Sequence, residues 1–368
     1  MKCIIFSDLH IAQHKKQQSR LNHCLEVLQW VFDVAKKQNV KNILFAGDLF
    51  QDRKLIDIMS YQRTFEVFQK NMSAADRPNV YLLLGNHDLF YFEKKDISSV
   101  YPLSSINGIT VVNEPCSLLI EDQEIGFLPY THNPLADLDK IRIKAKRKIL
   151  IGHVAVHGAL LNMMYGNVAD VQIEGDNEMT FVGPEIFDNY DRVFLGHYHA
   201  AQELSKTVEY VGSPLQLNFG ELSQDKHIVF YDSETDKRIY IRNTFSPIHW
   251  RFNSIKEAEA VALVGGLENQ FVDVLDENIQ SPEARDLRQM LIGQKVGSYS
   301  IRPQPKKAEQ QKVDAEKMQQ AVSILTNFNQ MLEQYVDSIE NLSFDRDDLL
   351  AVGKQICKFA LNPEKEEE

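Results

Sequence analysis

Short apolar runs alternate with stretches of helical periodicity over the first 245 residues of the chain. Between residues 20 and 38, apolar side chains recur every three or four positions, which predicts an amphipathic helix. Five runs have the length and composition of buried strands: CIIF (3–6), NILFA (42–46), VYLLL (80–84), KILI (148–151) and RVFL (192–195). The later runs ITVV, EIGFL, HIVFYD and RIYIR predict further strands. This alternation predicts an α/β fold.

The pattern changes after residue 245. Residues 246–303 predict a strand, helix, strand, helix and strand in that order, which indicates a small separate α/β domain. The stretch 304–312 is polar and aperiodic, as expected of a linker. Two amphipathic helices are predicted within 313–361. Their apolar faces either dock on the protein's own core or bind a partner.

Composition is that of an ordinary soluble globular protein, with 43% apolar and 25% charged residues among 368. No apolar stretch approaches the roughly 20 residues of a membrane helix, and the N-terminal apolar run is too short for a signal peptide. We therefore expect no membrane association. The cysteines Cys3, Cys24, Cys116 and Cys357 are scattered, which favours reduced thiols in a cytosolic protein.

Charge is distributed unevenly along the chain. The formal net charge of −12 argues against nonspecific binding to nucleic acid, because basic surfaces supply most of that affinity. Residues 140–148, KIRIKAKRK, nevertheless hold six basic residues in nine. Two interpretations of this basic run stay open: a solvated loop, or a patch that contacts phosphates.

Polar residues follow each of the five predicted strands, and in four of them a glycine comes first. Glycine allows a sharp turn and a close approach of the backbone. In α/β sheets, ligands gather beyond the carboxyl ends of the strands. We therefore expect these polar side chains to meet at one place. They are Asp8, His10, Asp48, Asn86, His153, His197 and His199, with His87 beside Asn86.

Carboxylate, amide and imidazole groups together suit Mn²⁺, Fe²⁺ or Zn²⁺ better than Ca²⁺. Seven ligands are too many for one ion and suit two. If Asp48 bridges, one ion takes Asp8, His10 and His199, and the other takes Asn86, His153 and His197. Two ions about 3.5–4 Å apart activate a water molecule and stabilise an in-line displacement at phosphorus.

His87 stands apart because its neighbour Asn86 is the better placed ligand. We interpret His87 as the general acid, or the charge stabiliser, for the leaving oxygen. The alternative is a structural histidine beside the site. His197 and His199 flank Tyr198, beyond the end of the predicted strand. Past Gly196 the chain need not follow strict strand alternation, so each histidine can meet a different ion. No role is assigned to Tyr198 between them.

The motifs SDLH, AGDLF, GNHD, GHVAVHG, GHYH and YVGSPLQLNFGE resemble those of the calcineurin-like metallophosphoesterases. The resemblance is strongest to the recombination-nuclease branch, which includes bacterial SbcD, its meiotic-recombination counterparts and the nuclease subunit of T4-like phages. GDLFQDRK followed by GNHDLFYFE is most similar to the phage versions. The resemblance covers roughly residues 1–245. It implies a four-layer β-sandwich flanked by helices, a small α/β cap domain and a C-terminal helical segment.

The resemblance also implies a function. Such a protein is a Mn²⁺-dependent DNA nuclease, with Mg²⁺ as the other candidate ion, and has 3′-to-5′ exonuclease and endonuclease activity. Residues 1–245 would form the nuclease domain, 246–303 the DNA-contacting cap, and 313–361 the segment that binds the coiled coil of an SbcC-type SMC-like ATPase. A homodimer in the cytoplasm (the host cytoplasm if phage-encoded) is expected. The seven metal positions and the catalytic position His87 carry over directly.

Two departures from related patterns matter. Several relatives have a histidine directly after GDLF, where this chain has Gln51. Ser/Thr phosphatases of the wider superfamily carry GDxxDRG, which GDLFQDRK does not match. Two rival functions stay open: a phosphodiesterase or nucleotidase for small molecules, and a scaffold that has lost the chemistry. The presence of all seven ligands and His87 disfavours the scaffold.

Overall fold

The computed structural model describes residues 1–92, 94–157, 159 and 182–304, together with positions 336, 346 and 350. Met1–Pro303 form one compact unit and Gln304–Glu368 a second. The linker and helical segment predicted over 304–312 and 313–361 therefore lie almost wholly outside the described residues. Val336, Arg346 and Leu350 are helical, and Val336 and Leu350 are buried.

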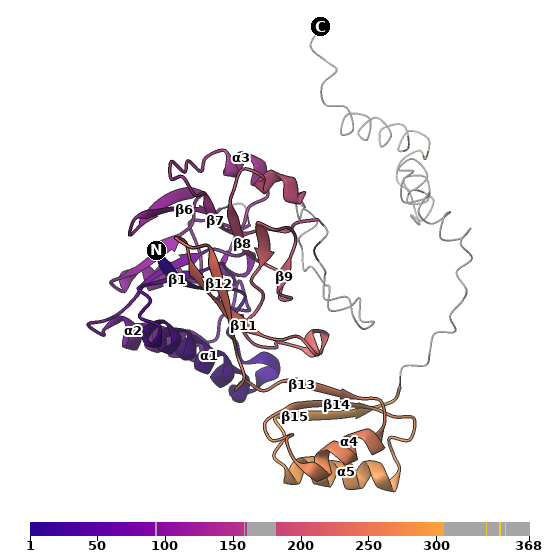
Figure 1. Cartoon of the computed structure of the whole chain (residues 1–368). Helices are drawn as coiled ribbons and strands as arrows, with labels where there is room; N and C mark the ends of the chain where they lie inside the picture. The colour runs from indigo at the N-terminus through magenta and orange to yellow at the C-terminus, as the bar shows by residue number, and fades with distance from the viewer. Residues whose placement is uncertain are drawn as a thin grey trace. The chain divides into compact units, whose positions relative to one another are not determined.

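The first sheet has six strands, of which β1 to β4 run parallel. In spatial order the strands are β12 (Lys237–Arg242), β11 (His227–Asp232), β1 (Lys2–Phe6), β2 (Asn42–Phe45), β3 (Asn79–Leu83) and β4 (Ile109–Val112). Helices α1 (Gln18–Lys37) and α2 (Ile58–Met72) lie side by side along this sheet (Figure 1). The helix predicted over 20–38 is thus α1.

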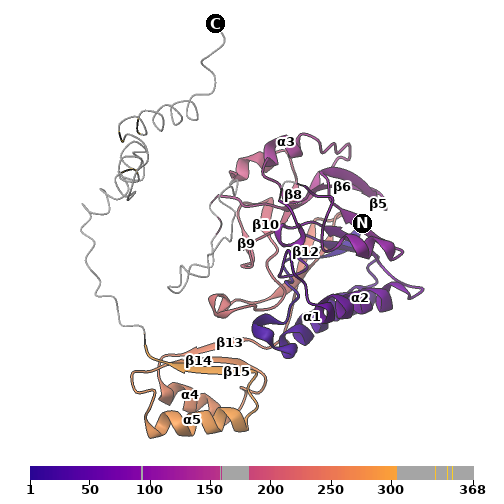
Figure 2. The same cartoon turned by 180° about the vertical axis from the view of Figure 1, so that it is seen from behind.

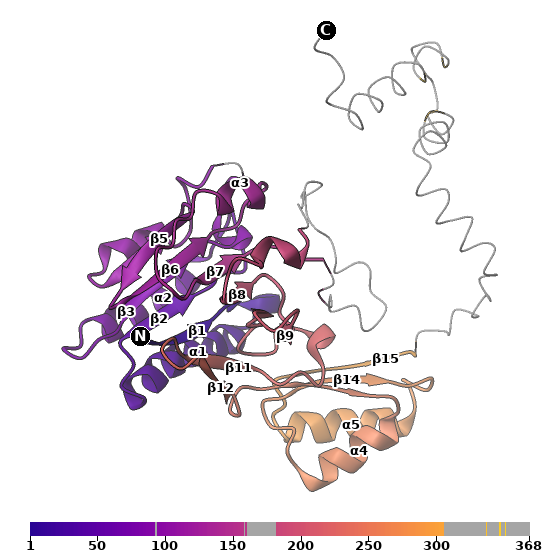
Figure 3. The same ribbon diagram turned by 45° about the horizontal axis from the view of Figure 1, so that its top comes forward.

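The second sheet also has six strands, and its central strands β6, β7, β8 and β10 run parallel. In spatial order the strands are β5 (Cys116–Ile120), β6 (Gln123–Leu128), β7 (Ile149–His153), β8 (Arg192–Gly196), β10 (Val208–Tyr210) and β9 (Gln202–Glu203). Figure 3 shows β5, β6, β7 and β8 as a layer of their own. The nine strands predicted before residue 245 are all present.

Alternation along the strands explains the layers, because successive side chains point to opposite faces of a sheet. Ile5 of β1 packs with Phe194 of β8 in the core between the two sheets. Ile4 and Phe6 point the other way, into the core that contains α1 and α2. On the second sheet, Leu195 packs outward under a cover that includes Ile141 and Phe187. Helices, sheet, sheet and outer cover are the four layers that the resemblance implied.

A third sheet lies between residues 249 and 302 and carries three parallel strands. The elements follow the predicted order: β13 (His249–Phe252), α4 (Ile255–Val264), β14 (Phe271–Leu275), α5 (Pro282–Gly293) and β15 (Ser298–Arg302). Both helices lie on one face of this sheet (Figure 2), and Ala258, Leu287 and Val272 join in a separate apolar core. We call residues 246–303 the cap.

The basic run 140–148 is an irregular connection that enters the amino end of β7. Its apolar residue Ile141 is buried, whereas Arg142, Lys144 and Lys146 are exposed. The polar residues that the sequence singled out lie at the carboxyl ends of the strands. The run is therefore at the opposite end of β7 from them.

Cys3, Cys24 and Cys116 carry free thiols, and Cys357 lies outside the described residues. Burial raises the pKa of the Cys24 thiol to about 11, which keeps it protonated and unreactive. None of the helices described combines the length and apolar character needed to span a bilayer.

Candidate metal centre and active site

The predicted site residues converge from both sheets. Asp8, His10 and Asp48 follow β1 and β2, and Asn86 and His87 begin the 3-10 turn η2 (Asn86–Asp88) after β3. His153 ends β7, and His197 and His199 follow β8 of the second sheet. The site thus lies where the carboxyl ends of two parallel β-layers meet, rather than at the edge of one open sheet.

Three of the predicted ligands form what we call the first group: Asp8, His10 and His199. One ligand atom from each lies within 4.8 Å of the others. The Nε2 atoms of His10 and His199 are 3.0 Å apart, and Nε2 of His10 is 4.0 Å from Oδ1 of Asp8. Each of the three side chains therefore directs a ligating atom into the same small space.

The second group consists of Asn86, His153 and His197. Oδ1 of Asn86 lies 3.1 Å from Nε2 of His153 and 3.1 Å from Nδ1 of His197. Nδ1 of His153 is 2.7 Å from the carbonyl of Ala46, which fixes the imidazole and leaves Nε2 directed at the site. The two groups therefore lie apart as clusters, and their assignment to two ions stays a prediction.

Asp48 lies between the two groups. Its Oδ2 is 3.6 Å from Nε2 of His10 and 3.4 Å from Nε2 of His153. Its other oxygen, Oδ1, accepts a hydrogen bond of 2.8 Å from the backbone N–H of His87. Burial favours the neutral acid, but His153 and His87 hold the pKa of Asp48 well below its usual value. Asp48 is thus an ionised carboxylate facing both groups.

The GHYH segment separates its side chains as expected. His197 faces Asn86 of the second group, whereas His199 faces His10 of the first. Tyr198 between them is buried in the outer core of the second sheet, with its ring centroid 4.8 Å from that of Tyr210. Its ring centroid is also 4.9 Å from that of His197, so Tyr198 packs against a ligand from the core side.

Unusual backbone conformations bring the ligands together. Asp8, His10, Asp48 and His197 have positive φ angles of 52°, 47°, 64° and 106°. Such angles are uncommon outside glycine and gather where a site is held under constraint. Gly196, just before His197, leaves no room for a side chain, because a Cβ there would collide with Ser7 Oγ and the carbonyl of Ala46.

The donor set fits divalent cations. The two closely facing Nε2 atoms in the first group are nitrogen donors that converge on one point, and His10 Nδ1 has no hydrogen-bond partner within the described part of the chain. Burial alone would lower the pKa of His153, yet Asp48 raises it to about 9. Carboxylate, amide and imidazole donors together form a ligand set that suits divalent ions.

His87 sits beside the first group, with its ring edge-on to that of His10 and the centroids 4.7 Å apart. Nδ1 of His87 is 2.6 Å from the backbone carbonyl of Gln51. This contact leaves Nε2 as the nitrogen to face a substrate. Because the carbonyl belongs to the backbone, the contact does not depend on which side chain occupies position 51.

A family model described as calcineurin-like phosphoesterase matches residues 1–201, a range that contains all seven expected ligands and His87. The chain belongs to the calcineurin-like phosphoesterase family. Members of this family use divalent metals, and the chain is accordingly a metal-dependent phosphodiesterase.

Curated proteins that are similar to this calcineurin-like phosphoesterase match it at low sequence identity. "Exonuclease subunit 1" of Enterobacteria phage T4 is 22% identical over 263 aligned positions, covering 68% of this chain and 71% of that protein. The SbcD component of the nuclease SbcCD from Staphylococcus saprophyticus is 22% identical and covers 76% of this chain and 75% of its own length. The same component from Bacillus subtilis is 23% identical, covering 91% of this chain and 93% of its own.

The phosphoesterase centre also uses residues that the sequence did not single out. Asp88 is fully buried, and its carboxylate accepts hydrogen bonds from the backbone N–H groups of Gly85, Asp48 and Leu49 at 2.9, 2.9 and 3.0 Å. Burial and the nearby Asp48 raise the pKa of Asp88 to about 6. Asp88 ties the loop after β2 to the turn after β3, and its place in GNHD was the available signal.

A second such carboxylate is Glu221, in the 3-10 turn η5 (Phe219–Glu221). Its Oε1 lies 2.9 Å from Nδ1 of His199. Burial opposes ionisation, but Lys226 and His199 lower the pKa of Glu221 below its usual value. Glu221 ends the GSPLQLNFGE stretch, which the resemblance includes without assigning it a role.

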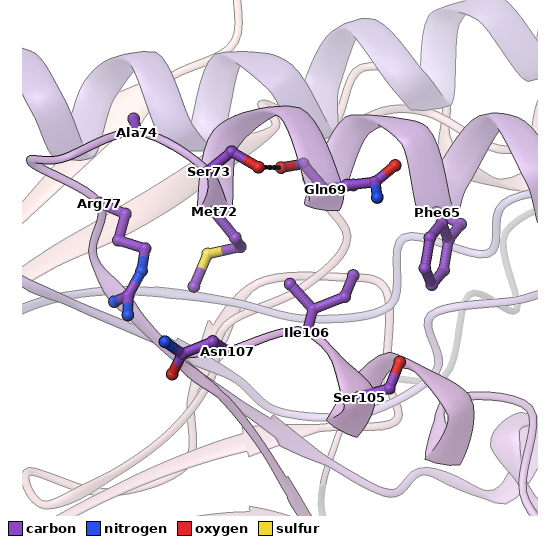
Figure 4. Close-up of a pocket in the computed structure, with 9 residues that line it drawn as sticks. All are labelled: Phe65, Gln69, Met72, Ser73, Ala74, Arg77, Ser105, Ile106 and Asn107. Carbon is purple, nitrogen blue, oxygen red and sulfur yellow. Dashed lines mark hydrogen bonds between the residues drawn. The ribbon is translucent and has the colours of Figure 1, made fainter.

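A surface cavity of about 540 Å³ lies elsewhere in the phosphoesterase, between α2 and the 3-10 turn η3 (Tyr101–Ser105). Figure 4 shows Phe65, Met72 and Ile106 lining it together with the charged side chain of Arg77. None of the expected metal ligands lines this cavity, and its described lining holds no carboxylate or imidazole.

Proposed function

We propose that the chain is a Mn²⁺-dependent DNA nuclease, with 3′-to-5′ exonuclease and endonuclease activity, that works in an SbcCD-like recombination and repair complex. The observation that carries this proposal is the position of Asp48, whose carboxylate lies 3.6 Å from His10 and 3.4 Å from His153. A carboxylate shared by two imidazole-rich groups is the arrangement that a two-ion phosphodiesterase needs. The nuclease names of the relatives support DNA as the substrate.

In this proposal the first and second groups would each hold one ion, and Asp48 would contribute to both. Two divalent ions bound there would supply an activated water molecule and offset the charge of the phosphate. His87 keeps Nδ1 on the carbonyl of Gln51, which orients its ring. Its Nε2–H would then donate a proton to the departing 3′ oxygen as the P–O bond breaks.

Incubation of the protein with linear duplex DNA and Mn²⁺, with and without a chelator, tests the proposal. We expect nucleotide release that the chelator abolishes. Duplexes labelled at the 3′ or the 5′ end report polarity, and a hairpin substrate reports endonuclease activity. If no chelator-sensitive cleavage occurs, alone or with an SbcC-type ATPase, the proposal is wrong. Replacing Mn²⁺ by Mg²⁺ identifies the preferred ion.

His87→Ala separates catalysis from metal binding. General acid catalysis contributes about 10²- to 10⁴-fold, so we expect a loss of cleavage in that range with unchanged Mn²⁺ binding. His23→Ala is a matched control, because the ring of His23 lies edge-on to that of Phe271 and this histidine is not among the expected ligands. Full activity of His87→Ala would assign the residue a structural role only.

The same assay distinguishes the rival small-molecule enzyme. Cyclic nucleotides and nucleoside monophosphates are offered at matched concentrations beside DNA. We expect a strong preference for DNA; a preference for the small substrates would favour a nucleotidase or cyclic phosphodiesterase. An inactive scaffold would bind neither Mn²⁺ nor substrate productively.

We assign residues 1–245 to the nuclease domain, 246–303 to a DNA-contacting cap, 304–312 to a linker and 313–361 to a segment that binds the coiled coil of an SbcC-type ATPase. The separate apolar core of the cap supports its assignment as a domain. Removal of residues 313–368 should abolish co-purification with the ATPase while leaving Mn²⁺-dependent cleavage of short DNA. Retained co-purification would place the partner surface elsewhere.

We also propose that the chain forms a homodimer, in the cytoplasm, through the apolar residues at and just before the start of α2. Leu55, three residues before the helix, and Ile58, its first residue, are 85% and 82% exposed. Exposed apolar side chains that lie together mark interaction surfaces. Leu55→Glu with Ile58→Glu should convert a dimer to a monomer in sedimentation, whereas Leu119→Glu, at another exposed apolar position, should not. If the double variant is still a dimer, the interface lies elsewhere on the chain.

A further inference from the structure

His199 differs from the other imidazole ligands in what holds it. It lies three residues beyond the last residue of β8, so strand hydrogen bonds do not fix its position. Instead its Nδ1 is 2.9 Å from Oε1 of Glu221, a carboxylate that is fully buried. An ionised carboxylate only accepts hydrogen bonds, so Nδ1 carries the proton.

This hydrogen bond determines which nitrogen of His199 can bind an ion. With the proton on Nδ1, the lone pair is on Nε2, which faces Nε2 of His10 at 3.0 Å. A carboxylate on the far nitrogen of a ligating histidine fixes both its tautomer and its ring orientation, and makes the other nitrogen a better donor. Glu221 thus orients a member of the first group, although its own carboxylate contacts only the far nitrogen of His199.

Glu221 is held in turn by Lys226. Nζ of Lys226 lies 2.6 Å from Oε2 of Glu221 and donates a hydrogen bond of 3.0 Å to the backbone carbonyl of His199. The same ammonium therefore supports His199 twice, through its backbone and through its carboxylate partner. Both Glu221 and Lys226 are buried, so neither charge is screened by solvent.

Ser213 completes this cluster, which we call the His199 support: Ser213, Glu221 and Lys226. The Ser213 hydroxyl is 2.7 Å from Nζ of Lys226 and 3.3 Å from Oε2 of Glu221. The backbone N–H of Ser213 donates to the carbonyl of His199 at 3.1 Å, and that of Leu217 donates to Glu221 at 3.2 Å. A buried polar network with this many partners holds its members in one arrangement.

We propose that Glu221 and Lys226 are positioning residues that fix His199 for the ion of the first group. The inference rests on the proposed two-ion site and adds residues outside the seven ligands. It also gives the GSPLQLNFGE stretch a purpose, because that stretch begins with Gly212 and Ser213 and ends at Glu221. In the second group, Nδ1 of His153 lies instead against the backbone carbonyl of Ala46.

Titration calorimetry with Mn²⁺ on the full chain tests this proposal. Wild type is compared with Glu221→Gln, which keeps an oxygen acceptor for His199, and with Glu221→Ala combined with Lys226→Met, which removes both buried charges together. We expect the double variant to bind one of two ions about 10- to 100-fold more weakly, with the other ion unaffected. Glu221→Gln keeps the acceptor but leaves Lys226 without its charged partner, so it should weaken binding of the same ion by less than the double variant does.

Glu209→Gln is the matched control. Glu209 is also a buried carboxylate in an ion pair, at 2.7 Å from Arg238, and it accepts a hydrogen bond from Tyr240 rather than from a ligand. The substitution Glu209→Gln should leave both Mn²⁺ affinities unchanged even if it lowers the melting temperature. Only a positioning role predicts a loss confined to one ion, because a general loss of stability would affect both.

The outcomes separate this inference from the proposed function. Wild type that binds no Mn²⁺ contradicts the two-ion site itself. Wild type that binds two ions, with both affinities unchanged in the double variant, contradicts only the role of Glu221 and Lys226. If the double variant fails to fold, Lys226→Met alone is measured. The proposal is overturned if this variant binds each of the two ions as tightly as wild type does.

Discussion

The two ligand groups of this phosphoesterase are built in different ways. In the second group, His153 belongs to β7 and its Nδ1 lies 2.7 Å from a backbone carbonyl. In the first group, His199 lies beyond its strand and depends on the side chains of Glu221 and Lys226. His10 of the same group has no hydrogen-bond partner at Nδ1 among the described residues. His153 is thus held through main chain, and His199 through a buried ion pair.

This difference indicates where each half is vulnerable. Hydrogen bonds to the backbone survive most side-chain substitutions, because every residue supplies the same carbonyl. A buried ion pair is lost when either partner changes, and the remaining charge is then left without compensation. Substitutions remote from the ligands should therefore damage the first group more readily than the second.

Loss of Asp48 should have the largest effect, because it is the residue that the two groups share. Asp48→Asn removes the charge that faces His10 and His153 at 3.6 and 3.4 Å. Stabilisation by two ions is worth several kcal/mol, so we expect cleavage to fall by roughly a thousandfold or more. Both Mn²⁺ affinities should weaken in calorimetry. If only one weakens, Asp48 serves a single group.

Removal of one ligand from each group should separate the halves. We expect His199→Ala and Asn86→Ala each to abolish binding of one ion, keep the other, and slow cleavage by about a hundredfold, on the order of 2.7 kcal/mol. Metal analysis after dialysis checks the count. If either variant loses both ions, the groups are not independent and the comparison between them fails.

Asp88→Asn should weaken the backbone that both groups share. Its carboxylate accepts three backbone hydrogen bonds, from Gly85, Asp48 and Leu49. Hydrogen bonds to a charged group are worth about 1.5–3 kcal/mol each, and an amide oxygen can replace part of them. We expect the free energy of unfolding to fall by about 2–3 kcal/mol in urea. No change would mean that other contacts hold these loops.

The basic run should matter least. Lys144 and Lys146 lie on the connection before β7, away from the carboxyl end where His153 sits. Lys144→Glu with Lys146→Glu should leave Mn²⁺ binding and cleavage within about twofold of wild type. Removing a lysine that binds a phosphate would reduce the slope of log affinity against log salt by about one. A slope lowered by one or two would show that the run binds DNA.

The positions of many residues in the centre are predictable, because each lies close in sequence to a strand that the apolar pattern predicts. Asp8, Asp48, Asn86, His153 and His197 each come just at or after the end of an apolar strand, so the pattern that predicts the strand also places the ligand. The same alternation predicts which side chains enter the core between the sheets. The assignment of each ligand to one of two ions stays a prediction.

The rest depends on contacts between distant positions. Glu221 lies 22 residues beyond His199, and no periodicity relates the two. The strand β5 escaped prediction because it is an outer strand whose Leu119 is 72% exposed, so its side chains do not alternate cleanly between core and solvent. β10 has only three residues, which is too short for a pattern. The meeting of two sheets at one site appears only in the folded chain.

The number of Mn²⁺ ions bound per wild-type chain tests the central claim most directly. Calorimetric titration of the metal-free protein, with metal analysis after dialysis, gives that number without any mutation or substrate. A shared Asp48 between two ligand groups predicts two ions per chain, with distinguishable affinities because the groups are held differently. One ion per chain, or none, would contradict the account.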